Sequence, residues 1–478
     1  MERIAIWRRG LTASGWRLAA TAGMAVALCL AAGSSSSLAA PDLPSSPWRL
    51  ATALRSPAWL DVSGEQRSRY ESLDGQFRLG REGSDQAFAL RTLLLTQVRG
   101  GPGRAVVELI DARQYLSDEG SPIDTTMVDA LDILQAYAQW DAGELIPGGT
   151  NTVRAGRETL DLGNRRLVAR NAYRNTINAF TGVDWLWEAT GGGWVRGFFF
   201  LPVRRLPDDP PSLLDNDIAL DSQSFDSQLG GLYGEIPGLP RNLRLESYYL
   251  YVHDEPTPRN RQRELHTLGG RLFREARPGA WDFEVESAFQ VGGSQSRAGV
   301  TVPELDHFAH LQHGALAYTF EHRWRPRVGL RYDYASGDAR PDDGENGRFD
   351  TLYGARRFEF GPTGIYGAVA RSNLNSPEYN LSLRPWPVLE CGVSHRFLWL
   401  AESRDSWTPA NLQDPTGASG TELGQQFEFR VRWQAMPGNL KLDAGYVHLF
   451  AGDFIGQAPG SAGKGDTRYF YTEVTLQF

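Results

Sequence analysis

Lysine and cysteine are almost absent from this chain of 478 residues. Of its 49 basic residues only Lys441 and Lys464 are lysines, so arginine carries nearly all the positive charge. That bias fits either a GC-rich genome or a surface that binds carboxylates and phosphates. The two cysteines are Cys29 and Cys391, and the first lies in a segment with the features of a signal peptide. An intramolecular disulfide and a cysteine-rich metal site are therefore not expected.

Long apolar runs are also absent beyond residue 40, and the mean hydropathy is −0.39. This excludes a polytopic helical membrane protein. A β-barrel is allowed, because only alternate residues of each strand face lipid. The chain has no G-x-S-x-G, H-E-x-x-H or phosphate-binding loop, so we expect no catalytic residues, no cofactor and no nucleic-acid partner.

Residues 1–40 have the three parts of a secretory signal peptide. Four arginines charge its front, residues 18–32 are apolar and uncharged, and small residues at 37–40 suit cleavage. Removal of this segment would change the net charge from −8 to −11, because it carries four arginines and one glutamate. We expect residues 41–478 to form a single domain outside the cytoplasm.

The last thirteen residues, Asp466–Phe478, alternate with a period of two. The apolar side carries Phe470, Thr472, Val474, Leu476 and Phe478, and the other side carries Tyr469, Tyr471, Glu473, Thr475 and Gln477. A strand that ends the chain on an aromatic residue is typical of the closing strand of an outer-membrane barrel, which would pair with the strand near residues 61–71. The edge strand of a soluble sandwich is the alternative interpretation.

Many other segments of about ten residues alternate in the same way, most clearly 281–291, 327–334 and 427–434. Between them, short Gly/Pro turns alternate with long polar loops, as an up-and-down barrel requires. The short turns include 100–103, 278–279, 324–326, 385–387 and 436–439, and the long loops, expected to be extracellular, are 161–176, 202–228, 253–261, 292–306, 337–351, 403–420 and 451–466.

Nineteen segments qualify as candidate strands: 61–71, 86–98, 104–113, 129–141, 151–159, 176–190, 193–202, 228–236, 242–253, 262–274, 280–291, 308–323, 326–335, 351–360, 378–385, 388–402, 421–435, 438–450 and 466–478. Both termini should lie on the periplasmic side, which requires an even number. We therefore predict an all-β fold, a single transmembrane antiparallel up-and-down β-barrel of about 18 strands. The weakest candidates are 151–159 and those within 351–385.

Two stretches resemble the signature of the alginate-export family of outer-membrane porins. The first is Arg154–Glu158 followed by Gly163–Val168 and a Phe-Thr-Gly at residues 180–182, and the second is Tyr334–Asp338 with the acidic residues that follow it. The resemblance implies an 18-stranded barrel that passes an anionic polysaccharide through an arginine-rich lumen. It also marks a set of motif residues: Gly156, Arg157, Glu158, Gly163, Arg166 and Gly182.

Alternation places several arginines opposite apolar strand faces, where they would project into the lumen. A charge facing lipid would cost about 2–4 kcal/mol at the midplane. The candidate substrate path is Arg91, Arg157, Arg244, Arg331, Arg430 and Arg432. Two interpretations stay open for each: a member of a ring of positive charge, or a structural arginine paired to an acid such as Glu428, Asp333 or Glu473.

The histidines at 307, 310 and 313 suggest a metal site at first sight. In a strand His307 and His313 share a face that His310 does not, so the three do not converge, and we predict no metal.

Together these features predict an outer-membrane channel, not an enzyme, that passes an anionic saccharide or alginate-like polysaccharide. Its partners would be outer-membrane lipid, the anionic saccharide and periplasmic export components. The alternatives are a secreted or periplasmic all-β enzyme acting on polysaccharide, an uptake porin for small organic anions, and an adhesive barrel without an open pore. If arginines line the bore, the pore should prefer anions, and replacing Arg331 and Arg430 together should weaken that preference.

Overall fold

The computed structural model describes residues 46–117, 120–257 and 260–478. The signal peptide predicted for residues 1–40 lies outside the described residues and stays a prediction. Within the described part of the chain, no helix is long and apolar enough to cross a membrane.

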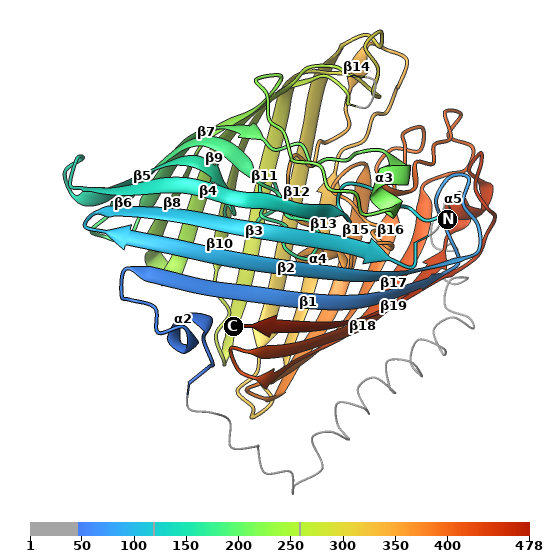
Figure 1. The fold of residues 1–478 in the computed structure, drawn as a ribbon. Helices are drawn as coiled ribbons and strands as arrows, with labels where there is room; N and C mark the ends of the chain where they lie inside the picture. The colour runs from blue at the N-terminus through green and yellow to red at the C-terminus, as the bar shows by residue number, and fades with distance from the viewer. Residues whose placement is uncertain (1–45, 118–119, 258–259) are drawn as a thin grey trace, which may run out of the picture.

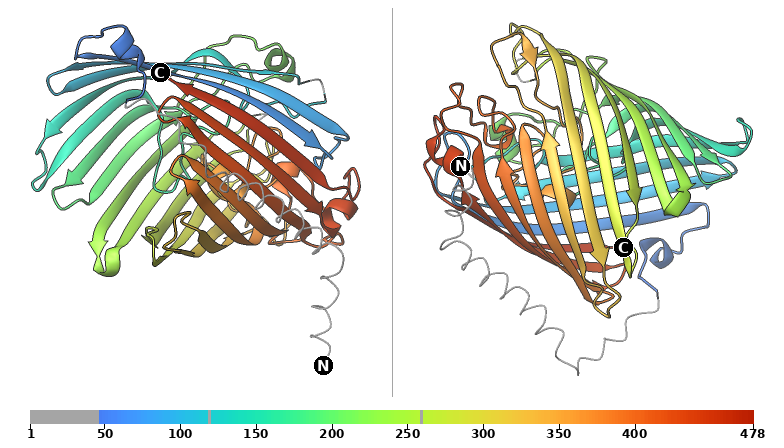
Figure 2. Two further views of the ribbon diagram at one scale, coloured as in Figure 1. Left: turned by 90° about the horizontal axis from the view of Figure 1, so that it is seen from below. Right: turned by 180° about the vertical axis from the view of Figure 1, so that it is seen from behind.

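Antiparallel strands run side by side around a closed barrel (Figures 1 and 2). The strands of the wall are β1 Leu60–Asp74, β2 Ser84–Gly100, β3 Gly103–Tyr115, β4 Asp129–Gly143, β5 Gly149–Glu158, β6 Phe180–Ala189, β7 Trp194–Pro202, β8 Ser227–Leu239, β9 Leu243–Asp254, β10 Arg263–Arg274, β11 Ala280–Ser294, β12 Leu305–Thr319, β13 Arg327–Ala335, β15 Leu374–Trp386, β16 Leu389–Trp399, β17 Glu422–Met436, β18 Leu440–Ala451 and β19 Thr467–Gln477. The short β14, Glu345–Asn346, lies in a loop and pairs in parallel with the start of β12.

The barrel closes between its first and last strands. β1 and β19 pair in antiparallel register from Glu65 opposite Gln477 to Asp74 opposite Arg468. This pairing confirms the closing strand expected from the sequence, and the wall has 18 strands once β14 is set aside from the 19 in the sheet. The short helix α2, Leu50–Ala53, lies at the same end as the C-terminus, where Asn439 joins the backbone of Trp48 to that of Gln477.

One candidate strand was wrong. Residues 351–360 do not join the wall, and they include the short helix α4, Arg357–Phe360, inside the barrel. The weak candidate 151–159 is a true strand, β5. The other described helices are also short: α3 Pro210–Leu214, α5 Asp453–Gln457, and the 3₁₀ turns Pro240–Asn242 and Thr408–Ala410.

The two faces of each strand meet different surroundings. In β19 the side chains of Phe470, Val474 and Leu476 are exposed on the outside, whereas Tyr469 and Tyr471 are buried. Other strands repeat the pattern, and exposed apolar side chains on the outer face include Leu94, Val107, Trp140, Val183, Phe199, Leu232, Leu268, Trp281, Val285, Phe289, Phe308, Leu316, Val328, Leu330 and Trp433. An apolar band of this kind is what a barrel presents to lipid.

A closed barrel should resist unfolding by detergent. We expect the unheated protein to migrate faster than the boiled protein in SDS gels, and its circular dichroism to be rich in β-structure, because the hydrogen-bonded ladder has no free edge. A water-soluble, helix-containing monomer would contradict this expectation.

Two loops do not stay outside the barrel. The loop of residues 159–179, after β5, and the loop of residues 336–373, after β13, fold into the lumen. The first reaches across to β11 through Arg166, and the second reaches β1, where the backbone N–H of Ile365 donates to Glu71. The predicted extracellular loops 161–176 and 337–351 lie within these two segments. Their inward course fills the middle of the barrel.

Candidate substrate path

The two inward loops form a partition across the lumen, because they bind each other. The backbone N–H of Tyr353 donates to the carbonyl of Leu167 at 2.9 Å, and that of Ala355 donates to the carbonyl of Arg165 at 2.9 Å. The partition is thus held together by backbone hydrogen bonds and one isolated bridge, Val168 with Tyr353, between segments that lie almost 190 residues apart in the sequence.

Arginines of the barrel wall bind the backbone of the first loop. Arg67 donates to the carbonyls of Ala172 and Arg174 at 2.8 and 2.7 Å, and Arg91 donates to the same two carbonyls at 2.9 Å each. Arg69 donates to the carbonyl of Tyr173 at 2.7 Å. Backbone carbonyls of a loop inside a barrel need donors, and these guanidinium groups supply them.

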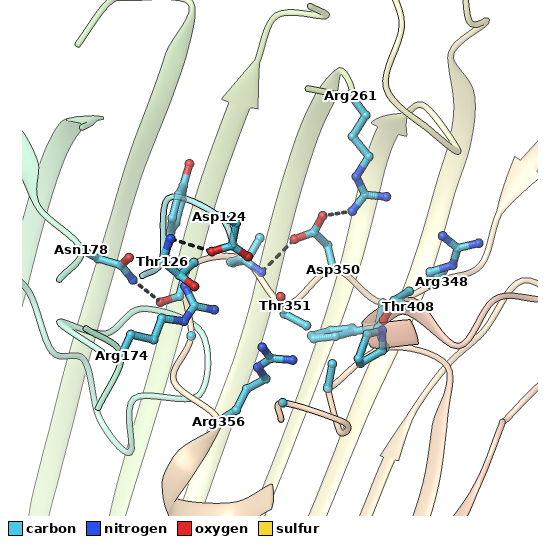
Figure 3. A pocket seen from close by; sticks show the side chains of 18 of the residues that line it. Asp124, Thr126, Arg174, Asn178, Arg261, Arg348, Asp350, Thr351, Arg356 and Thr408 are labelled. Atoms are coloured by element: carbon cyan, nitrogen blue, oxygen red, sulfur yellow. Dashed lines mark hydrogen bonds and ion pairs between the residues drawn. The ribbon is translucent and has the colours of Figure 1, made fainter. Parts of the chain in front are cut away.

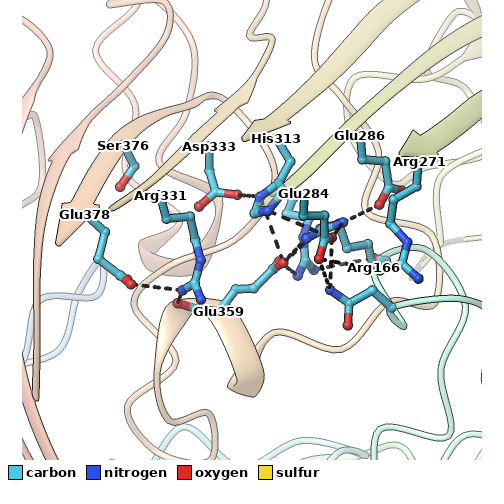
Figure 4. Close-up of polar contacts among 12 residues, drawn as sticks. Arg166, Arg271, Glu284, Glu286, His313, Arg331, Asp333, Glu359, Ser376 and Glu378 are labelled. Carbon is cyan, nitrogen blue, oxygen red and sulfur yellow. Dashed lines mark hydrogen bonds and ion pairs between the residues drawn. The ribbon is translucent and has the colours of Figure 1, made fainter. Parts of the chain in front are cut away.

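A network of buried charges also holds the partition, on the side that faces β11 (Figure 4). Arg166 of the first loop is 2% exposed and contacts three carboxylates, those of Glu284 and Glu286 on β11 and Glu359 on α4. Burial would raise the pKa of Glu359, but the guanidinium groups of Arg166 and Arg371 hold it well below its usual range. Arg166 therefore links both loops to the wall.

The same network contains His313, Asp333 and Glu359, three side chains close enough to share an ion. They do not fit a metal, because guanidinium groups already pair with both carboxylates and the imidazole is hydrogen-bonded to one of them. His313 bonds to Asp333 at 2.7 Å, Arg396 pairs with Asp333 at 2.9 Å, and Arg371 pairs with Glu359. This cluster is an ion-pair network rather than a metal centre.

On the long-loop side of the partition lies a cavity of about 640 Å³, which we call the outer cavity (Figure 3). Only two carboxylates line it among the described residues, those of Asp124 and Asp350. Its arginines are Arg78, Arg174, Arg205, Arg261, Arg263, Arg348 and Arg356. Three of them are neutralised: Arg261 and Arg263 pair with Asp350, and Arg348 pairs with Asp405.

The other four, Arg78, Arg174, Arg205 and Arg356, have no carboxylate within 4.0 Å among the described residues. Burial and the guanidinium group of Arg356 lower the pKa of Arg174 to about 9. Burial and the guanidinium group of Arg371 lower the pKa of Arg356 to about 10. Burial and the guanidinium group of Arg81 lower the pKa of Arg78 to about 10. Arg78, Arg174 and Arg356 therefore stay charged at neutral pH, and the mutual repulsion of the guanidinium groups around the cavity would be relieved by a bound anion.

On the opposite side of the partition lies a cavity of about 310 Å³, which we call the inner cavity. At two places, neighbouring residues of the chain face different cavities. Tyr173 faces the inner cavity and Arg174 the outer cavity, and Arg357 faces the inner cavity and Arg356 the outer cavity. Most inner-cavity cations are paired, as Arg357 is with Glu428 at 2.8 Å. The free positive charge is therefore concentrated in the outer cavity.

The structure places the six arginines of the predicted path in different surroundings. Each of the six pairs with at least one acid: Arg91 with Glu65, Arg157 with Asp132, Arg244 with Glu235 and Glu275, Arg331 with Glu378, Arg430 with Asp443, and Arg432 with Glu390. Arg430 and Arg432 line the inner cavity, and Arg331 also donates to the carbonyl of Glu359 at 3.1 Å. Arg157 lies on the side of β5 that carries exposed Val153, and it contacts Asp132 at 3.4 Å.

The motif residues cluster where the first loop leaves the wall. Gly156 and Gly182 are direct cross-strand partners in β5 and β6, and Glu158 pairs with Arg154 at 3.1 Å. Gly163 has φ +48°, and a Cβ there would lie 1.9 Å from the hydroxyl of Tyr233. Only glycine fits this turn. The turn directs the loop inward, so that Arg166 reaches the carboxylates of β11.

The sequence profile of the alginate export family matches residues 58–467. The chain belongs to the alginate export family. The match spans nearly the whole barrel, from just before β1 to the first residue of β19. Comparison with curated protein sequences gives no match. The protein is thus an outer-membrane channel of this family.

Several solved structures of proteins from Pseudomonas aeruginosa and Acinetobacter baumannii have a similar fold. OccK8 (OprE) of Pseudomonas aeruginosa superposes with a TM-score of 0.55 and 11% identity, covering 88% of this chain and 98% of that one. OpdK of the same organism, solved with vanillate, superposes with a TM-score of 0.56 and 12% identity, and the match covers 88% of this chain and 98% of OpdK. OccAB2 of Acinetobacter baumannii superposes with a TM-score of 0.56 and 11% identity, and the match covers 88% of this chain and 98% of OccAB2. At these identities the likeness concerns the fold.

Proposed function

We propose that this channel passes an anionic saccharide or alginate-like polysaccharide along an arginine-lined path, without a catalytic role. The observation that carries the proposal is the set of four unpaired arginines in the outer cavity, Arg78, Arg174, Arg205 and Arg356. A uronate residue carries one carboxylate, which a guanidinium group can bind in a bidentate way. Several unpaired guanidinium groups around one cavity suit a ligand with several carboxylates.

The path would run from the inner cavity, past the partition, to the outer cavity. The two cavities share no lining residue, and their linings meet at Tyr173 next to Arg174 and at Arg356 next to Arg357. An extended chain therefore needs the partition to shift. The loops can shift without loss of the wall, because each wall strand pairs with two other wall strands, and the two loops add only the two-residue pairing of β14 with β12 to this ladder.

Uptake of a small organic anion is the second candidate function. It is favoured by the partition itself, since a cavity of about 640 Å³ can hold a small carboxylate without movement of the loops. OpdK, with which this chain shares its fold, has been solved with vanillate. Block of ion current by a uronate hexamer but not by the monomer would support the polysaccharide channel, and equal block by both would support the small-anion channel.

Ion selectivity tests the arginine-lined path directly. In planar bilayers under a salt gradient, we expect a reversal potential of anion-selective sign despite the acidic composition of the chain, because the field inside the narrow cavity governs permeation. The preference should weaken as salt is raised, since the screening length falls from about 10 Å at 0.1 M to about 3 Å at 1 M. A cation-selective pore would contradict the proposal.

A further inference from the structure

A second cluster of titratable groups lies at the long-loop rim and lines neither the outer nor the inner cavity. It comprises Asp129 and Asp132 at the start of β4 and Asp221 in the loop between β7 and β8. One carboxylate oxygen from each lies within 4.8 Å of the others. Oxygens at this spacing can all reach a single ion that binds at about 2.4 Å.

A β-bulge brings the two strand residues together. In a regular strand, residues three apart point to opposite faces. Here Ile110 pairs with Asp132 and Ala112 pairs with Asp129, so two steps along β3 match three along β4. Leu131, between the two aspartates, takes φ +54° and points outward. Asp129 and Asp132 consequently lie on the same side of the wall.

The three carboxylates differ in how their oxygens are satisfied. Asp132 accepts hydrogen bonds from the backbone N–H groups of Ile133 and Asp221, and Asp221 accepts one from Leu206 at 2.8 Å. Asp129 is 2% exposed, and its Oδ1 is buried with no hydrogen-bond partner among the described residues. A buried, ionised carboxylate is strongly unfavourable unless a cation balances it.

Nearby arginines do not balance the cluster. Arg157 contacts Asp132 at 3.4 Å, and Arg205 influences Asp129 and Asp221 without contacting either within 4.0 Å. Three carboxylates thus face two guanidinium groups, one of which donates instead to the carbonyls of Thr125 and Ile177. Burial and the carboxylate of Asp129 raise the pKa of Asp221, as expected when negative charge is in excess.

We propose that Asp129, Asp132 and Asp221 bind a divalent cation of the Ca²⁺ type at the outer rim of the barrel. All the available ligands are oxygens, and half-buried Asp221 leaves room for the water molecules that complete the shell of this ion. The ion would tie the loop of residues 203–226 to β4. Since Arg205 of that loop lines the outer cavity, the ion would also fix one of its unpaired arginines. The site does not depend on the identity of the transported anion.

Titration of CaCl₂ into the full-length protein in detergent micelles tests this site. We expect one Ca²⁺ per chain with a dissociation constant on the order of 0.1–1 mM, and at least about tenfold weaker binding for Asp129→Asn and for Asp221→Asn. The matched control is Asp453→Asn, which alters an exposed rim aspartate paired with Lys464. Absence of saturable binding, or binding unchanged in Asp129→Asn, would overturn the proposal.

Thermal melting separates an ion ligand from a merely structural aspartate. In EDTA, Asp129→Asn should melt at a higher temperature than the wild type, because it removes an unbalanced charge, and in about 10 mM CaCl₂ the order should reverse. A variant that melts lower than the wild type in both conditions would show a structural role and would also overturn the proposal.

Discussion

The double variant Arg174→Gln/Arg356→Gln should bind a short oligo-uronate at least about tenfold more weakly than the wild type, measured as block of the ion current. Each guanidinium group faces the outer cavity without a carboxylate partner, so each is free to bind the ligand. A hydrogen bond to a charged group contributes about 1.5–3 kcal/mol, and the loss of one such bond already corresponds to about a tenfold change.

The matched control is Arg331→Gln/Arg430→Gln, which removes the same number of arginines from the lumen. These two already bind Glu378 and Asp443, so the affinity for the oligo-uronate should change by less than about threefold. Heat-modifiable migration would confirm that both variants keep the barrel. Equal losses in the two variants would favour the path predicted from strand alternation over the four unpaired arginines of the loops.

The wall of the barrel could be predicted from the sequence because each strand separates two surroundings. Outward positions meet lipid and inward positions meet water or polar groups, so β19 and β11 show plain alternation. The prediction of a strand at 351–360 was wrong for the same reason. Its apolar side chains, such as Phe360, are buried in the partition and not in the wall, and the chain there must satisfy its backbone inside the lumen.

The proposed substrate path could be predicted only in part, because the course of a loop depends on contacts that are distant in the sequence. Alternation showed that Arg91 and Arg331 point inward, but not that they hold the loops of the partition. The unpaired arginines Arg174 and Arg356 lie in irregular segments, where no periodicity assigns a side. The resemblance did identify Arg166, although its partner Glu359 lies 193 residues away.

The arginines of the wall and those of the loops therefore make different contacts. Arg67, Arg69 and Arg91 project from strands and donate to loop carbonyls, which positions the partition. Arg174 and Arg356 lie on the partition itself and present their charge to the outer cavity. The arginine bias of the composition serves both needs, since a guanidinium group has five donors and keeps its charge when buried.

The variant Arg166→Gln should loosen the partition and so raise the single-channel conductance, with frequent switching between conductance levels. Arg166 is the side chain through which the first loop binds Glu284, Glu286 and Glu359 together. Glu359 keeps Arg371 and Glu284 keeps Arg271, but the buried carboxylate of Glu286 loses its only cation within 4.0 Å among the described residues, a loss of about 3–5 kcal/mol in comparable sites. The strand ladder is untouched, so the barrel should still show heat-modifiable migration.

Limited trypsin digestion of the detergent-solubilised protein supplies a second readout, since release of the loop exposes Arg165 and Arg170 to cleavage. Arg166→Lys should restore part of the order, because it keeps the charge but cannot contact three carboxylates at once. The control is Arg244→Gln, which breaks an ion pair with Glu235 and Glu275 at the short-turn end of β9, far from the partition. If Arg166→Gln and Arg244→Gln both leave conductance and loop cleavage at the wild-type level, the buried network does not hold the partition, and the contacts of Arg67 and Arg91 with the loop backbone must suffice to do so.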